Sequence, residues 1–172
     1  MGATQVPAAS TSDNWVQISS VTPTAGVSTL SFTSIAGYKK LLLSIRNPGQ
    51  SGTAACNLTF NSDTGANYAY SALGNSSGTL ASSANTTSAS NIVLGTGGTG
   101  VLYGNLTIDE ANTTGLKNVS GFYMNGTSGA VPYPSLSGIY FGSTAISTVT
   151  LTLTGGATFA ASGTVALYGV AA

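Results

Sequence analysis

The stretch TVTLTLT, residues 148–154, alternates threonine with an aliphatic residue at every position. Successive side chains of a β-strand point to opposite faces of the sheet, so Val149, Leu151 and Leu153 would share one face. The threonines would then occupy the other face, which can meet solvent. We therefore expect a strand with one buried face, as in the sheets of a two-layer β protein.

The same alternation recurs along most of the chain, while helical periodicity is nearly absent. The clearest further cases are CNLTFN, residues 56–61, and KKLLLSIRN, residues 39–47. Turn-forming Gly, Asn and Ser residues separate the other candidate strands, which are 15–20, 27–35, 68–73, 90–95, 101–109, 117–125, 136–142 and 164–170. About ten or eleven short strands predict an all-β, single-domain β-sandwich, with a jelly roll as its expected form.

Two segments lie outside this strand pattern. Residues 1–14 are expected to form an extended N-terminal arm, held by a neighbouring subunit, that precedes a β-sandwich domain of residues 15–172. Residues 74–90, GNSSGTLASSANTTSAS, are low in complexity and are expected to form a long exposed loop. The chain begins without the charged and apolar regions of a secretory signal, so we expect synthesis in a cytoplasm.

The composition is unusual in its lack of charge. Only 5% of the 172 residues are charged and the net charge is zero, whereas about 25% is typical of soluble domains. Because surface charge keeps proteins apart in solution, such a chain is expected to pack against copies of itself or a larger scaffold. Four Lys and Arg residues give little attraction for nucleic acid, and no run of 18 apolar residues could cross a membrane.

Few residues are suited to catalysis or metal binding. The chain has no histidine and one cysteine, so neither a Ser-His-Asp site nor a cysteine zinc site can be assembled. Cys56 lies on the apolar face of its strand and is expected to be a core residue. Asp109 and Glu110 are adjacent, would point to opposite faces of a strand, and are interpreted as turn residues. We therefore expect no enzyme activity and assign no catalytic residue, cofactor or metal.

The segment LTFNSDTGANYAYSALG, residues 58–74, contains the most distinctive turn. Asn61, Asp63 and Gly65 have the spacing of oxygen ligands in a calcium loop, but Ala66 and Ala72 stand where an EF-hand needs Gly and Glu. A looser calcium site remains an alternative. We favour a structural turn, in which these three residues hydrogen-bond the backbone and Asp63 holds the connection between strands 55–61 and 68–73.

Four residues are candidates for an interface. Lys39, Lys40 and Arg46 are three of the four cations and lie within eight residues of one another. They could dock an acidic partner surface, or they could only keep a strand edge soluble. Trp15 follows the expected arm directly and could anchor an interface, since one large aromatic side chain can dominate a contact. The alternative for Trp15 is a core residue at one end of the sandwich.

Three stretches also resemble a known family in their order and spacing. They are SFTSIAGYKKLLLSIR (31–46), LTFNSDTGANYAY (58–70) and TAISTVTLTLTGGATFAASGTVALYGV (144–170). The matching residues are Phe32, Ser34, Ile35, Tyr38, Leu41, Phe60, Asn61, Asp63, Gly65, Asn67, Tyr68, Gly163, Leu167, Tyr168 and Gly169. Over most of residues 27–170 the chain resembles a group of virion structural proteins of tailed bacteriophages.

The resemblance implies a non-enzymatic role on the phage particle, with the protein located in the virion after synthesis in the host bacterial cytoplasm. The leading interpretation is a capsid decoration, or cement, protein that forms a homotrimer or another homo-oligomer and contacts the major capsid protein or other virion proteins. The alternative is a tail or fibre component with a lectin-like role. In that case exposed tyrosines would stack on a glycan, and the candidates are Tyr68, Tyr70, Tyr123, Tyr133 and Tyr140.

Overall fold

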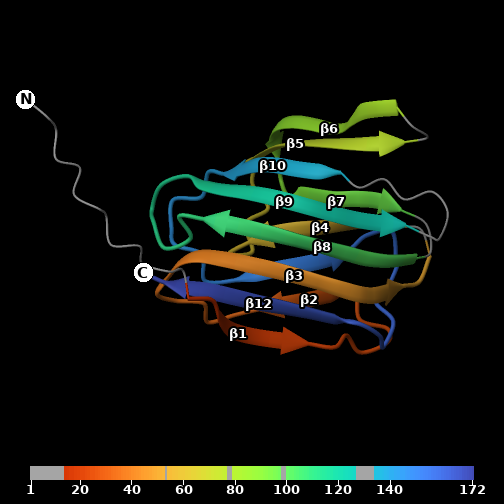
Figure 1. Cartoon of the computed structure of the whole chain (residues 1–172), viewed down its shortest axis with the longest axis horizontal. Coiled ribbons are helices and arrows are strands. Elements are labelled where there is room, and N and C mark those ends of the chain that lie inside the picture. Colours follow the sequence, from red (N-terminus) through yellow and green to blue (C-terminus); the bar gives the residue numbers. More distant parts are fainter. Residues whose placement is uncertain (1–13, 53, 77–78, 98–99, 127–133) are drawn as a thin grey trace, which may run out of the picture.

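The computed structural model describes residues 14–52, 54–76, 79–97, 100–126 and 134–172. Within these ranges the chain is all-β, and two antiparallel sheets pack against each other as a sandwich (Figure 1). The prediction of an all-β sandwich is therefore confirmed. The expected N-terminal arm, apart from the exposed Asn14, lies outside the described residues.

The described ranges contain twelve strands, which run in chain order as β1 (Val16–Val21), β2 (Thr29–Phe32), β3 (Tyr38–Gln50), β4 (Ala54–Phe60), β5 (Tyr68–Ser76), β6 (Thr79–Ala89), β7 (Ile92–Gly97), β8 (Gly100–Asp109), β9 (Lys117–Gly126), β10 (Ser135–Tyr140), β11 (Val149–Leu153) and β12 (Thr164–Ala171). The larger sheet has the order β1-β12-β3-β8-β9-β10-β5-β6, and the smaller has the order β2-β11-β4-β7. Alternation in the sequence located all of these strands except β6.

The expected long loop at residues 74–90 is wrong. Strand β5 continues to Ser76, and β6 pairs with it antiparallel as the last strand of the larger sheet. The segment is built from Ser, Thr, Ala, Asn and Gly with a single leucine, so no alternation of large apolar and polar residues marks it as a strand. Its pairing with β5 uses backbone hydrogen bonds, which do not depend on that signal.

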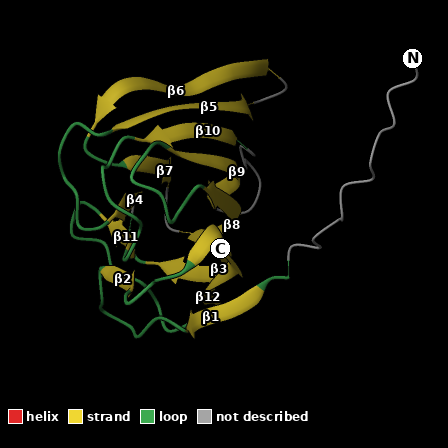
Figure 2. Ribbon diagram, turned by 90° about the vertical axis from the view of Figure 1, so that its left-hand side faces the viewer, coloured by secondary structure: helices red, strands yellow, loops and turns green. Residues whose placement is uncertain are grey.

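The twelve described strands divide into an eight-stranded frame and four strands that extend its larger sheet. If β5, β6, β9 and β10 are set aside, β1-β12-β3-β8 lies opposite β2-β11-β4-β7, with four strands in each layer. We call the four extending strands, β9-β10-β5-β6, the wing. Figure 2 shows the larger sheet bending, with β1 and β6 at its two ends and the smaller sheet within the bend. The wing also contacts the smaller sheet, through β9 and β7.

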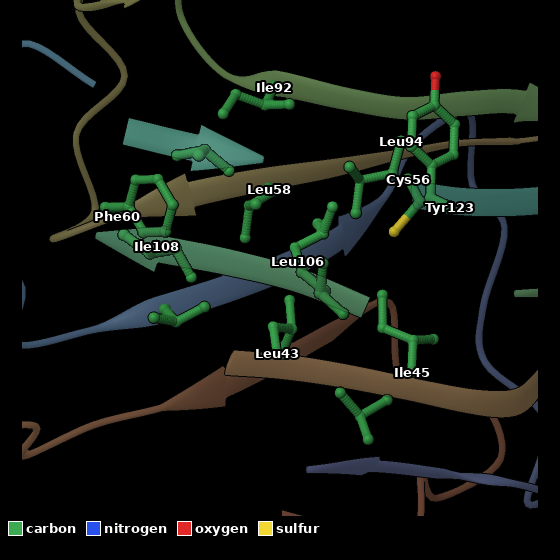
Figure 3. Packing of buried hydrophobic residues seen from close by; sticks show 14 of the residues in the cluster. Leu43, Ile45, Cys56, Leu58, Phe60, Ile92, Leu94, Leu106, Ile108 and Tyr123 are labelled. Carbon is green, nitrogen blue, oxygen red and sulfur yellow. The ribbon is translucent and has the colours of Figure 1, made fainter. Parts of the chain in front are cut away.

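The core lies between the two sheets and follows the alternation of the sequence. On β11 the aliphatic residues of the 148–154 stretch are buried and Thr150 and Thr152 are only partly so. On β4 every second residue from Ala54 to Phe60 is likewise buried. Figure 3 shows side chains from β3, β8, β4 and β7 meeting between the layers. The expected buried faces of β4 and β11 are thereby confirmed.

Cys56 is fully buried in this core, and burial raises the pKa of its thiol to about 12. The thiolate is the reactive form, so the native protein should not react with the thiol reagent DTNB at pH 8. The protein unfolded in urea should react completely with one equivalent. Rapid reaction of the native protein would contradict the burial of Cys56.

Candidate functional site

Residues 61–67 form a corner between the two layers. They join β4 of the smaller sheet to β5 of the larger one. Asn61 and Ser62 have φ of 53° and 55°, and the backbone N–H of Asp63 donates to the carbonyl of Phe60 at 2.9 Å. Left-handed backbone is tolerated well by Asn, which suits position 61. The turn therefore begins directly after the last core residue of β4.

The carboxylate of Asp63 is the acceptor for three donors in this corner. Its Oδ1 accepts from the backbone N–H of Gly65 at 2.8 Å, and its Oδ2 accepts from the side-chain amide of Asn67 at 2.9 Å. The hydroxyl of Tyr140 donates to the same Oδ2 at 3.1 Å. Burial raises the pKa of Asp63, but these hydrogen bonds outweigh it and hold the pKa below its usual value. Asp63 is thus held as an anion that ties the turn to β10.

Asn61 ties the same corner to the loop that precedes β11. Its amide nitrogen donates to the hydroxyl of Thr144 at 3.1 Å and to the carbonyl of Ala145 at 2.9 Å. Its Oδ1 accepts from the backbone N–H of Ser147 at 2.7 Å and of Thr148 at 3.2 Å. The side-chain oxygens of Asn61 and Asp63, which a calcium loop would use as ligands, therefore accept hydrogen bonds from different segments of the chain. The described residues also contain no group of three His, Cys, Asp or Glu side chains placed to hold a metal.

The tyrosines proposed for glycan stacking are in the interior. Tyr68, Tyr70, Tyr123 and Tyr140 are all buried, so that part of the prediction is wrong, and Tyr133 lies outside the described residues. The Tyr68 and Tyr140 rings stack at 4.9 Å beside Phe60. The Tyr68 hydroxyl accepts a hydrogen bond from the Phe60 N–H at 2.9 Å, so this buried hydroxyl has a hydrogen-bond partner in the corner.

Lys117 is a buried residue that the sequence did not mark. Its side chain is fully enclosed, its Nζ donates to the carbonyl of Gly142 at 2.6 Å, and it lies 5.6 Å from the centre of the Tyr140 ring. Burial lowers the pKa of Lys117. The contacts come from chain segments 23 to 25 residues away, so no local pattern could have located them.

The outer face of β1, β12, β3 and β8 is hollowed into a trough. It is open to solvent, has a volume of about 600 Å³ and is lined mainly by Trp15, Leu42, Ser44, Arg46, Asn105 and Tyr168. Strand pairing places Ser20, Ala166, Ser44 and Asn105 in one row across the four strands. Ala166 and Ser44 are buried although they point away from the core, because larger side chains stand on both sides of this row.

The predicted interface residues divide between the trough and the rest of β3. Trp15 is 37% exposed and lines the trough, so the alternative of a core tryptophan is wrong. Arg46 lines it too and donates from Nη2 to Asn105 Oδ1 at 3.3 Å. Lys40 shares that face but lies 3.8 Å from Asp109 in an ion pair. Lys39 lies at the irregularity where the start of β3 pairs with the end of β12, and it is not among the residues that line the trough.

The two carboxylates at the end of β8 occupy the positions expected of turn residues. Asp109 is the last residue of the strand, and Glu110 follows it with φ of 60°. The backbone N–H of Thr113 donates to the Glu110 carbonyl at 3.2 Å, which closes the turn. The pair is therefore placed to end a strand rather than to face a common substrate.

The outer face of the wing carries large apolar side chains among serines, and the side chains described on it include no charged group. Phe122 and Leu73 flank Ser135 from the two neighbouring strands, and both are more than two-fifths exposed. Two residues further along β10, Ser137 pairs with serines on both neighbouring strands. Ile139 is the next residue of β10 on this face. We call this surface the wing face. Its large exposed residues are Leu73, Phe122 and Ile139, and the exposed Leu116 and Phe141 border it.

Comparison with known proteins gives no relative: no protein family, characterised protein or solved structure was found that matches this chain. In the described part of the chain, no helix is long and apolar enough to cross a membrane. The wing face and the trough are therefore the features from which a function can be argued.

Proposed function

We propose that the protein is a non-enzymatic structural component of a tailed-phage virion, a capsid decoration protein that stabilises the head by self-association and by contacts to capsid subunits. The observation that carries this proposal is the wing face. Large apolar side chains gathered on one exposed surface are typical of protein interaction sites. Here they stand on a hydrogen-bonded sheet, which presents them in a fixed arrangement.

A finer assignment of the fold supports the proposal. We propose that the eight-stranded frame is a jelly roll, because its strands give the sheet orders of two Greek keys, β1-β12-β3-β8 and β2-β11-β4-β7. Jelly rolls occur in viral capsid proteins and in lectins. In this assignment β5-β6 and β9-β10 are two hairpins inserted into the frame, and together they build the wing.

The acidic residues support a structural rather than a catalytic role. Asp63 accepts hydrogen bonds from the corner, and Asp109 is paired with Lys40. Glu110 lies in a tight turn. Glycoside hydrolysis uses a pair of carboxylates that face one substrate, whereas the side chains of Asp63 and Asp109 are each engaged with neighbouring residues of the sandwich.

Self-association would bury the wing face between copies arranged around a symmetry axis. Few charges oppose such contact, because the chain has only eight charged residues. Strand β6 ends the larger sheet, so its outer backbone groups can pair with a neighbouring chain. The arm expected at residues 1–14 would add contact to the capsid, as the sequence suggests.

The wing face can be tested by the double variant L73S/F122S. It should weaken self-association at least tenfold, about 1.4 kcal/mol, in sedimentation velocity, because it removes two apolar side chains from the contact. The thermal unfolding midpoint of the variant should fall by only a few degrees, since both side chains are more than two-fifths exposed. The matched control is Val16→Ser, which removes an exposed aliphatic side chain from β1, outside the wing. A monomeric wild-type protein at micromolar concentration would overturn this part of the proposal.

The location in the virion has its own test. Mass spectrometry of purified heads and tails of the encoding phage should find the chain in the head fraction. Heads made without the protein should release DNA at a lower temperature, and added protein should restore the wild-type value. Absence of the chain from purified particles would overturn the virion role, and its presence in tails alone would overturn capsid decoration.

A further inference from the structure

We propose that the trough on β1, β12, β3 and β8 is a binding site for an oligosaccharide that carries carboxylate groups. The inference goes beyond the proposed function and is argued from different residues. The trough and the wing face share the outer face of the larger sheet and meet where Asn105 of β8 pairs with Phe122 of β9. A volume of about 600 Å³ lies within the usual range of ligand sites.

The shape of the trough follows from strand register. The floor is the row of small side chains that contains Ala166 and Ser44. Tyr168 and Leu42 pair on one side of this row, and Thr164 and Arg46 pair on the other. The two walls are four residues apart along the strands, or about 13 Å between backbone positions. The trough therefore runs across the strands and is open along its length.

The apolar contacts are aromatic and partly exposed. Tyr168 pairs with Gln17 on β1, and Trp15 precedes Gln17 by two residues on the same face. Diagonal neighbours across two antiparallel strands are within reach of aromatic side chains, so the two rings line the same end of the trough. Sugar rings present flat C–H faces that pack on aromatic rings, while their hydroxyls stay available for hydrogen bonds.

The polar contacts include one cation and several neutral donors and acceptors. Arg46 is held by its hydrogen bond to Asn105, and this leaves other N–H groups of the guanidinium for a ligand. A guanidinium matches a carboxylate in a bidentate pair. Among the described residues that line the trough none is a carboxylate, and Asp109 in the neighbouring row is paired with Lys40. Charge complementarity therefore favours an acidic sugar over a neutral one.

Other polymers fit this surface less well. A nucleic acid would need several cations along its phosphates, and the lining contains one. A peptide that adds a strand to a sheet needs an unpaired strand edge. At the trough, β12 and β3 are paired on both sides, and only β1 has an unpaired edge. A peptide added to β1 would lie beside the trough and leave its floor on β12 and β3 unoccupied. Amide and hydroxyl side chains around an aromatic end suit a hydroxyl-rich ligand.

The test uses the fluorescence of Trp15, which is the single tryptophan of the chain. Titration of the full chain with tetragalacturonate should give a saturable change in emission. The fully methyl-esterified tetramer has the same sugar rings without the negative charges, and it should bind at least tenfold more weakly. Equal affinity for the acid and the ester would overturn the proposal, as would no saturable change at millimolar tetragalacturonate.

Two charge-matched variants locate the effect. Arg46→Gln should weaken binding of the acid about tenfold and leave binding of the ester unchanged. Lys39→Gln removes the same charge from the start of β3, outside the residues that line the trough, and should leave both affinities at the wild-type value. Equal losses in the two variants would assign the effect to net charge and overturn the site. Emission that changes with protein concentration alone would place a second copy in the trough and overturn it as well.

Discussion

Gly163→Ala is expected to lower the free energy of unfolding severely, whereas Gly156→Ala should have a much smaller effect. Gly163 has φ of 68°, and a Cβ at this position would overlap the backbone of Asn47 and Pro48 in β3. Asn47 and Pro48 lie at an irregularity of β3, between the paired residues Arg46 and Gly49, so their backbone is held on both sides. To make room for a Cβ, β3 and the start of β12 would have to separate. We expect a loss of about 4 kcal/mol or more, a large part of the stability of a typical domain.

Gly156 is the matched control for this prediction. It has a similar φ of 79°, but a Cβ there would meet no atom within 4 Å. Its replacement should cost only the left-handed strain of a non-glycine residue, about 1–2 kcal/mol. Urea unfolding followed by circular dichroism measures both variants. Stabilities that agree within about 1 kcal/mol would show that the close approach at Gly163 can relax, contrary to this expectation.

Asp63→Ala is expected to cost about 2–4 kcal/mol of unfolding free energy at pH 7. The substitution removes the acceptor for Gly65, Asn67 and Tyr140, so three donors in the corner lose a charged partner. Thr64→Ala is the control, since Thr64 is an exposed neighbour in the same turn. That variant should stay within about 0.5 kcal/mol of wild type in urea unfolding at pH 7. A loss in Thr64→Ala equal to that in Asp63→Ala would mean that the turn is sensitive to any change.

The difference between wild type and Asp63→Ala should also depend on pH. The pKa of Asp63 is lowered in the folded protein, so its carboxylate stabilises the fold fully above the unfolded pKa, about 3.9. That contribution is lost as the pH falls through the folded pKa, where the carboxylate takes up a proton. The gap in unfolding free energy should therefore narrow below about pH 4. A gap that stays constant from pH 7 to pH 2 would contradict a role for the charge.

The alternation of residues predicted the layers of this fold because one-sided burial leaves a period of two in the sequence. The stretch 148–154 and the β4 segment show this directly. Strand β6 left no such trace, because it is built from small and polar residues at the end of a sheet. The same alternation should have placed Tyr68 and Tyr70 inside, since they are spaced by two and follow the turn onto a strand.

The candidate sites were predictable only where they are local in sequence. The corner around Asp63 could be expected, since Gly65 and Asn67 lie two and four residues from Asp63. The trough could not, because its floor brings Ser44 beside Ala166 and Asn105, which are 122 and 61 residues away (166 − 44 and 105 − 44). Only strand register creates that row. The resemblance in the sequence gave an expected role for the protein but no indication of this surface.

The enclosure of Lys117 has a practical consequence for mapping this protein in an assembly. Amine-reactive cross-linkers need an accessible lysine nitrogen, and Lys117 is sealed beneath Tyr140 and Gly142. The other two lysine side chains, Lys39 and Lys40, are neighbours at one end of β3. Cross-links through lysine will therefore report that end of the molecule. To identify proteins that contact the wing face, a photoreactive group will have to be introduced on β9 or β10.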